Sequence, residues 1–265
     1  MMDTGLSHRL PAIFVGHGSP MNALEDNAYT QAWARIGQTI PKPKAILAVS
    51  AHWYTHGTAV TAMETPRTIH DFGGFPQALF DMRYPAPGSP PLAGRVRELL
   101  QPVDVRLDHE WGLDHGTWSV LVKMYPDADI PVVQLSIDAN QPPSFHLETG
   151  RRLAALRDEG VLLLATGDIV HNLRTMRWGS VPAYDWAARF NQEVRDCLLR
   201  GDMQQLAAYE DWGHDAHLSV PTPEHFLPLL YIAGAKLDDE PVSIPVDGIE
   251  LGSVSMMVVA VGKLA

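Results

Sequence analysis

The stretch Phe14-Val-Gly-His-Gly-Ser-Pro-Met21 decides how the rest of the chain is arranged. It continues the apolar run 12–15, which predicts a buried first strand, so that His17 falls at the carboxyl end of this strand. In open α/β sheets, ligands bind outside the carboxyl ends of the strands. Glycines on both sides of His17 leave its imidazole free of neighbouring side-chain bulk. The stretch therefore predicts an α/β fold that presents a histidine; a histidine that only caps a tight turn is the alternative.

Two further apolar runs also deliver a histidine near their carboxyl ends. Residues 45–50 have strand length and precede His52, and residues 160–166, the most apolar run of the chain, precede His171. A fourth histidine, His225, falls in a first helical turn after two prolines, a position that favours exposure. Because the carboxyl ends of parallel strands meet at one edge of a sheet, we expect these histidines to lie together.

His115 stands just ahead of an expected helix over residues 119–124. The N-terminus of a helix is a favourable place for an anionic or oxygen-bearing ligand. His115 is therefore a candidate active-site residue, and the alternative is that it only caps the helix.

The remaining pattern alternates between strands and helices. Further strands are expected at 58–63, 103–107, 130–136 and 254–262, and helices at 24–36, 91–100, 145–159, 184–199 and 203–209. This order predicts an α/β fold, a single three-layer αβα domain with a central mostly parallel (mixed) sheet and residues 160–166 near its centre. No internal repeat, linker or shift in composition divides the chain, so residues 1–265 are expected to form one domain.

Residues 64–90 have no clear period and are rich in proline and glycine. So long a loop in a compact domain is usually functional or disordered. Four aromatic residues argue against disorder, because they would be costly to leave in water: Phe72, Phe75, Phe80 and Tyr84. We therefore expect a structured loop that lies over the site.

Composition narrows the classes of partner. The chain has 265 residues, of which 46% are hydrophobic and 19% charged, as in an ordinary globular protein. A net charge of −11 argues against nucleic acid and against an anionic membrane surface, and favours a small organic substrate. One cysteine excludes an intrachain disulfide, and no apolar run approaches the roughly 20 residues of a membrane span. We expect a soluble cytoplasmic protein, and its oligomeric state stays open.

The histidines indicate a metal site. Four of them are candidate ligands: His17, His52, His171 and His225. Imidazoles without a thiolate cage suit Zn(II) or Fe(II), and an open coordination position would make the site catalytic. Three carboxylates stand near candidate histidines in the sequence and could fix imidazole tautomers, although each could equally be a cap or a surface residue: Asp114, Asp168 and Glu224. The residues alone leave the reaction open.

Six short motifs follow one another along nearly the whole chain. They are Gly16-His-Gly-Ser-Pro-Met21, Ser50-Ala-His-Trp53, Asp71-Phe-Gly-Gly-Phe-Pro76, Leu113-Asp-His-Gly-Thr-Trp118, Gly167-Asp-Ile-Val-His-Asn172 and Pro223-Glu-His-Phe-Leu-Pro228. In this order they resemble the motif set of the class III extradiol ring-cleavage dioxygenases, and more narrowly the LigB-like branch of 4,5-DOPA-extradiol dioxygenases. One such motif alone would be weak evidence, whereas six in order are specific.

The resemblance implies a single αβα domain that binds a divalent metal and opens a catechol ring with O2 to a muconic semialdehyde. It implies that His17 and His52 are metal ligands and that His225 stands where more distant relatives use a carboxylate. It matches His171 to a position that is either a further ligand or an acid/base group. His115 matches a second active-site histidine that faces the substrate or bound oxygen.

The metal follows from the same resemblance. Fe(II) is expected for activity, and Zn(II) is plausible as the bound ion, because an imidazole in place of a carboxylate leaves the site more positive. A catechol must lose protons to bind through both oxygens, and histidine is a suitable base near neutral pH. Four aromatic side chains could either wall the substrate ring or belong to the core: Trp53, Phe72, Phe75 and Trp118.

Two other functions fit the same histidines. A zinc-dependent hydrolase would use Zn(II) to activate water instead of O2. A non-catalytic metal-binding protein would keep the fold and the ion without turnover. The measurement that separates them is the reaction of the metal-loaded protein with a catechol in air. Only the dioxygenase is expected to open the ring.

Overall fold

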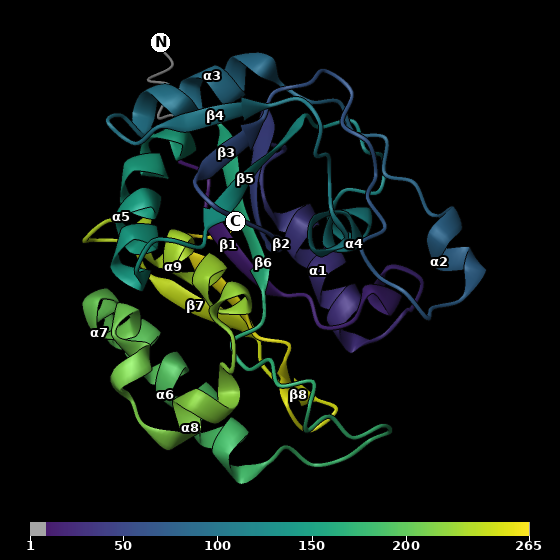
Figure 1. The fold of residues 1–265 in the computed structure, drawn as a ribbon, viewed down its shortest axis with the longest axis vertical. Helices are drawn as coiled ribbons and strands as arrows, with labels where there is room; N and C mark the ends of the chain where they lie inside the picture. The colour runs from purple at the N-terminus through teal and green to yellow at the C-terminus, as the bar shows by residue number, and fades with distance from the viewer. Residues whose placement is uncertain (1–8, 265) are drawn as a thin grey trace, which may run out of the picture.

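An eight-stranded sheet forms the middle layer of the computed structural model, which describes residues 9–264 (Figure 1). The strand order is β4-β3-β5-β2-β6-β1-β10-β7. Its strands are β1 (Ala12–Gly16), β2 (Ala45–Thr55), β3 (Thr58–Thr61), β4 (Val105–Asp108), β5 (Val132–Asp138), β6 (Val161–Gly167), β7 (Val242–Val246) and β10 (Val258–Val261). A separate two-stranded sheet joins β8 (Ile249–Glu250) and β9 (Val254–Ser255).

The centre of the large sheet is parallel and its edges are mixed. Strands β5, β2, β6 and β1 pair in parallel in that order, whereas β10 pairs antiparallel with both β1 and β7. On the other side, β3 is antiparallel to β5 and parallel to β4. The predicted α/β fold with a central mixed sheet is confirmed, and residues of the most apolar run lie near the middle of the sheet.

Alternation along β6 explains the three layers. Leu163 and Ala165 face one hydrophobic cluster, and Leu162 and Leu164 face the other. Side chains of a strand point to opposite faces in turn, so a strand that is apolar throughout must be covered on both sides.

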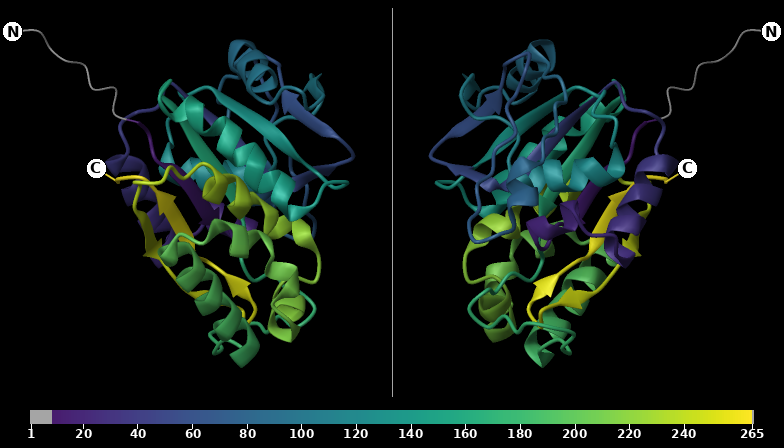
Figure 2. Two further views of the ribbon diagram at one scale, coloured as in Figure 1. Left: turned by 90° about the vertical axis from the view of Figure 1, so that its left-hand side faces the viewer. Right: turned by 90° about the vertical axis from the view of Figure 1, so that its right-hand side faces the viewer.

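Helices cover both faces of the sheet (Figure 2). The first face carries α3 (Pro90–Leu99), α5 (Pro143–Leu153), α6 (Asp185–Arg200), α7 (Met203–Ala207) and α9 (Leu227–Gly234). The second face carries α1 (Ala28–Thr39) and α4 (His115–Met124). The shorter elements are α2 (Gln77–Asp81), α8 (His214–Ser219) and the 3-10 turns η1 (Pro20–Ala23), η2 (Ala154–Arg157), η3 (Tyr209–Asp211) and η4 (Pro223–His225). None of the helices in residues 9–264 is both long and apolar enough to cross a bilayer.

Several element boundaries differ from those expected. Strand β2 continues past residue 50, so His52 lies inside the strand and not after it; the pairing of β2 with β5 shifts register between Val49 and Tyr54. Such an irregularity re-aims the side chains near it. The last expected strand, 254–262, is divided into β9 and β10.

Helix starts also differ, for reasons of capping. His115 is the first residue of α4 and does not precede it, because Asp114 is the N-cap and accepts a hydrogen bond from the Thr117 amide at 3.2 Å. Helix α1 begins at Ala28 because the Asn27 side chain accepts hydrogen bonds from the first turn.

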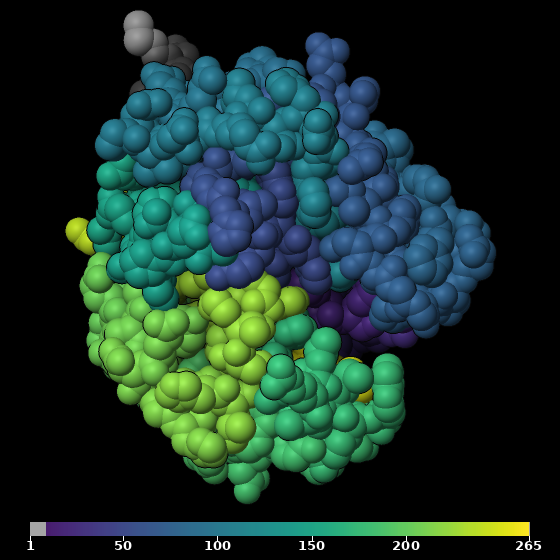
Figure 3. Space-filling model, in the orientation of Figure 1, coloured from purple at the N-terminus to yellow at the C-terminus, as the bar shows by residue number. Residues whose placement is uncertain are grey.

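The loop 64–90 is structured, as predicted, and is fastened to the segment before α4. The Ile69 amide donates to the Leu113 carbonyl at 2.7 Å, and the Leu113 amide donates to the Arg67 carbonyl at 2.9 Å. Tyr84 is buried and its hydroxyl donates to the Tyr125 carbonyl at 2.9 Å. In the space-filling view the surface is hollowed between this loop, blue at the right, and a green segment below it (Figure 3).

Candidate metal centre

The five histidines singled out in the sequence form one cluster, at the end of the sheet to which the carboxyl ends of its parallel strands point. They are His17, which follows β1; His52 in β2; His115 at the start of α4; His171, which follows β6; and His225 at the end of η4. Backbone hydrogen bonds hold the segments together: the His17 amide donates to the Gly167 carbonyl at 3.0 Å, and the Asp168 amide donates to the His225 carbonyl at 2.9 Å. The predicted convergence is therefore present.

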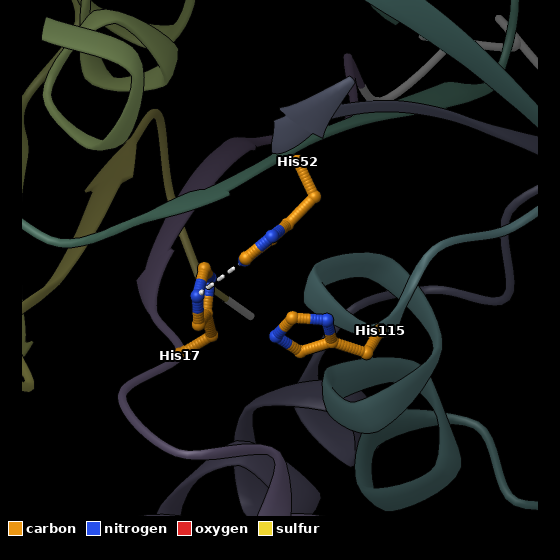
Figure 4. A group of neighbouring side chains, drawn as sticks. All are labelled: His17, His52 and His115. Carbon is orange, nitrogen blue, oxygen red and sulfur yellow. Dashed lines mark hydrogen bonds between the residues drawn. The ribbon is translucent and has the colours of Figure 1, made fainter. Parts of the chain in front are cut away.

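His17 and His52 face each other through their ring nitrogens. Their Nε2 atoms are 3.2 Å apart, and His115 is turned toward both rings (Figure 4). Three groups have potential ligand atoms within 4.8 Å of one another: His17 with His52 and His115, His17 with Asp168 and His225, and His171 with Glu224 and His225.

Ring spacing distinguishes residues that could share one ion from residues that lie beside it. A tetrahedral ion with Zn–N bonds of about 2.0–2.1 Å separates the centres of two bound imidazoles by roughly 5.3 Å. His17 and His52 are separated by 5.1 Å, His17 and His225 by 5.5 Å, and His52 and His225 by 5.1 Å. These three rings therefore have the spacing of ligands around a single ion.

The rings of His115 and His171 each lie closer to another imidazole than two ligands of one tetrahedral ion would. His115 lies 3.8 Å from His52 between ring centres, and His171 lies 3.5 Å from His225. By nitrogen positions alone, His115 is the nearer partner of His17 and His52. Rotation about the Cβ–Cγ bond moves the ring nitrogens but leaves the ring centre nearly in place, so the spacing of the centres persists when a ring turns toward an ion. His115 and His171 thus flank the trio of His17, His52 and His225.

Burial favours the neutral form of four of these rings: His17, His52, His171 and His225. Desolvation, followed by repulsion from the neighbouring imidazoles, lowers the pKa of both His17 and His225 well below the usual value. Desolvation also lowers the pKa of His52 to about 3 and that of His171 to about 4. A neutral imidazole is the form that binds a metal, so the cluster is ready to act as a donor set near neutral pH.

Asp168 supplies a buried carboxylate next to the trio. Its Oδ1 accepts the Gly18 amide at 2.9 Å, and its Oδ2 lies 3.6 Å from His17 Nε2 without a hydrogen-bond partner in residues 9–264. Burial raises the pKa of Asp168 well above the usual value. His17 Nδ1 is likewise buried without such a partner. A carboxylate oxygen and neutral imidazoles gathered in a buried site fit a divalent cation, which would compensate the buried charge.

The other two expected carboxylates have different surroundings. Glu224 Oε1 lies 3.1 Å from His225 Nδ1, as expected for a residue that orients this ring. Asp114 is fully buried and accepts hydrogen bonds from Ser50 at 2.7 Å and from the Gln134 side-chain amide. Desolvation raises the pKa of Asp114. These hydrogen bonds make Asp114 the cap of α4 and a link to the sheet.

The sequence interpretation missed Asp71, which lies in the loop 64–90. Its Oδ1 is 2.9 Å from His115 Nδ1, and its Oδ2 is 3.3 Å from His52 Nδ1. Burial opposes ionisation, but the contacts with His115 and His52 outweigh it and lower the pKa of Asp71. Asp71 is the first residue of one of the six motifs, and this position was the signal in the sequence that could have marked it as a site residue. The loop around it has no strand or helix period, so the pattern gave no expected orientation for its side chain.

The aromatic candidates divide into two kinds. Phe72 lies 5.4 Å from His115 between ring centres, and Phe75 packs against Phe72 at 5.5 Å, so both stand beside the cluster. Trp118 is completely buried and donates its Nε1–H to the Ile69 carbonyl. Trp53 is buried and stacks on Trp111. The two tryptophans therefore belong to the packing of the protein.

Comparisons with known proteins agree with this architecture. Residues 5–258 match the family described as the catalytic LigB subunit of aromatic ring-opening dioxygenase. The chain is 60% identical over 260 residues to 4,5-DOPA dioxygenase extradiol of Escherichia coli K12, covering 97% of this chain and 96% of that one. It is 40% identical over 233 residues to the protein of the same name from Beta vulgaris, covering 84% and 85%.

A solved structure of an uncharacterized protein from Escherichia coli K12 superposes with a TM-score of 0.85 at 54% identity, covering 96% of this chain and 100% of that one. The family match spans nearly all of the chain, and the histidine cluster lies within it. This chain therefore belongs to the LigB family of aromatic ring-opening dioxygenases.

Proposed function

We propose that residues 1–265 act as one catalytic domain that binds a divalent metal and opens a catechol ring with O2 by extradiol cleavage. The substrate is a DOPA-like catechol and the product a muconic semialdehyde. The spacing of 5.1–5.5 Å among the rings of His17, His52 and His225 carries the proposal, because it fits one shared ion. The names of the relatives, 4,5-DOPA dioxygenase extradiol, support this choice of substrate class.

In this proposal His17, His52 and His225 hold the metal. Fe(II), when bound, supplies a centre at which O2 and an electron-rich ring can be activated together. Zn(II) suits the same donor set and is plausible as the ion that the protein carries. Asp168 is buried beside His17, and a bound cation would stabilise the ionised form of its carboxyl group.

His115 and His171 are the proton-transferring residues of the proposal. Each lies against one ligand ring, His115 against His52 and His171 against His225, on opposite flanks of the trio. A catechol must release its hydroxyl protons as it binds, and an imidazole placed next to a substrate oxygen can accept one. The Phe72 ring, packed edge-on to His115, offers an apolar wall that excludes water from that side.

Anaerobic reconstitution tests the proposal. The metal-free protein is loaded with Fe(II) or Zn(II), mixed with a panel of catechols that includes DOPA, and exposed to air enriched in heavy-isotope O2. A yellow product that carries labelled oxygen in its new carboxylate, formed with Fe(II) alone, is the expected result, because the aldehyde oxygen exchanges with water. Hydrolysis of esters or amides by the Zn(II) form would support a hydrolase, and absence of turnover with every metal would support a non-catalytic metal-binding protein.

The proposed location is the cytoplasm. The single cysteine, Cys197, is buried and burial raises the pKa of its thiol to about 11, so it is an inert packing residue. A chain with one unpaired thiol suits a reducing compartment.

A further inference from the structure

Asp71 connects two histidines that come from different elements. One carboxylate oxygen accepts the His115 backbone amide at 3.0 Å and lies 2.9 Å from His115 Nδ1, which has no aligned hydrogen bond to any group in residues 9–264. The other oxygen lies 3.3 Å from His52 Nδ1. The side chain is mostly buried, at 20% exposure. A single carboxylate therefore contacts the same edge, the Nδ1 edge, of both imidazoles.

The opposite edges of these two rings face the candidate metal centre. His52 Nε2 lies 3.2 Å from His17 Nε2, and one ring nitrogen of His115 is turned toward His17 (Figure 4). A neutral imidazole has one N–H and one lone pair, and the partner of one nitrogen decides the state of the other. A carboxylate can only accept, so it favours N–H on Nδ1 and leaves the lone pair on Nε2.

The surrounding chain fixes Asp71 in this position. Two residues before it, the Ile69 amide and carbonyl are held by Leu113 and Trp118. One residue after it, Phe72 packs against His115. The start of α4 is also pressed against the sheet, because a Cβ on Gly116 would lie 2.9 Å from His52 Cδ2. The carboxylate and both rings thus have little freedom to separate.

We propose that Asp71 is the positioning residue that sets the tautomer and orientation of both His52 and His115. Through one side chain, the loop 64–90 would keep a lone pair of His52 directed at the metal and a lone pair of His115 directed at the substrate. The inference rests on the proposed function, in which His52 is a ligand and His115 accepts a proton.

The test compares three full-length variants with the unmodified protein. Asp71→Asn replaces one acceptor oxygen with an amide donor, Asp71→Glu keeps the carboxylate, and Asp81→Asn changes an exposed carboxylate in the same loop as a matched control. Two quantities are measured for each: the Zn(II) dissociation constant by competition with a chelator, and the histidine tautomers by nitrogen NMR with and without Zn(II). Neither measurement needs ring opening, so failure of the dioxygenase proposal would not be confused with failure of this one.

Before any metal is added, the unmodified protein should show N–H on Nδ1 of both His52 and His115. Asp71→Asn should weaken Zn(II) binding by roughly 10- to 100-fold and move at least one proton to Nε2. Asp71→Glu should keep both tautomers and recover much of the affinity, while Asp81→Asn should behave as the unmodified protein.

Protonated Nε2 on either histidine of the metal-free, unmodified protein would overturn the inference, and this result does not depend on whether any variant folds. Unchanged Zn(II) affinity and unchanged tautomers in a folded Asp71→Asn protein would overturn it as well.

Discussion

The imidazole of His171 lies flat against that of His225, with ring centres 3.5 Å apart and ring planes inclined by 10°. Two rings at this separation are closer than the roughly 5.3 Å between imidazoles bound to one tetrahedral ion, although their nitrogens and Glu224 also form one of the three ligand groups. In contrast, His225 has ligand-like spacing to both His17 and His52. The pair therefore divides into one candidate ligand and one candidate acid/base group.

His171→Ala should keep the metal and lose turnover. We expect a metal content close to that of the unmodified protein and a decrease in kcat of about 10²- to 10⁴-fold, the usual contribution of a positioned acid or base. His225→Ala should instead lose the metal. Metal analysis of both purified variants and oxygen-uptake rates with Fe(II) measure the two effects. Loss of metal from His171→Ala would make His171 a ligand.

His17→Ala should weaken metal binding more than a substitution of a residue that contacts only a ligand and not the metal. Removal of a ligand from the trio should exceed the roughly 10- to 100-fold loss that follows removal of a hydrogen-bond partner of a ligand. His214→Ala is a suitable control, because His214 is exposed on α8 and lies in none of the three ligand groups. Chelator competition with Zn(II) gives the dissociation constants. Similar constants for the two variants would contradict the proposed centre.

Gly116→Ala should disturb the centre through packing. A Cβ at this position would lie 2.5 Å from Ser50 Oγ and 2.9 Å from His52 Cδ2, so α4 or the His52 ring must shift. We expect a loss of about 1–3 kcal/mol in the free energy of unfolding, together with weaker Zn(II) binding.

Gly94→Ala provides the matched control for this change. Gly94 lies in α3, and a Cβ there would meet nothing within 4 Å. This variant should gain roughly 0.5–1 kcal/mol, because alanine restricts the unfolded chain and glycine destabilises a helix interior. Denaturant unfolding monitored by circular dichroism measures both. An equal stability change in the two variants would show that the contact with His52 has no energetic effect.

His146 should make the stability of the protein depend on pH outside the metal centre. Burial lowers the pKa of His146 to about 4, and its Nδ1 lies 2.9 Å from the Tyr231 hydroxyl. The unfolded chain binds a proton near pH 6.5, whereas the folded chain does so only near pH 4. Stability from this group is thus complete above pH 6.5 and is lost as the pH falls toward 4.

The measurement compares the unmodified protein with His146→Gln, both metal-free, by denaturant unfolding at about pH 7.5 and pH 5. The free energy of unfolding of the unmodified protein should fall by about 2 kcal/mol more than that of the variant over this interval. Other buried histidines contribute to both proteins and cancel in the comparison. A difference that is the same at both pH values would mean that His146 is not held neutral by the fold.

Local patterns were enough to predict the fold and the place of the site. Residues 161–165 of the run 160–166 are apolar on both faces, so the run was expected to lie near the middle of a covered sheet, and β6 does. The runs that end near His17 and His171 were expected to be parallel strands of one sheet with their carboxyl ends at the same edge, and β1 pairs with β6 in parallel. Hydrophobic periodicity and strand length depend on neighbours in sequence, which is why these features could be predicted.

Other features depended on contacts between distant segments. The continuation of β2 past residue 50 depends on its register shift against β5, and the start of α4 at His115 depends on its Asp114 cap. Asp71 belongs to a loop without a period, so only its contacts with His52 and His115 show its place in the site.

The sequence by itself determined that this chain forms an α/β sheet with histidines at the carboxyl edge. The apolar runs that form buried strands, and the glycines and prolines that end them, are local features of the sequence. Only the tertiary structure decided that the rings of His17, His52 and His225 have the spacing of ligands while those of His115 and His171 lie against a neighbour. The physical reason is that distances between rings are set by how separate strands, turns and a helix pack together, to within less than the width of one ring.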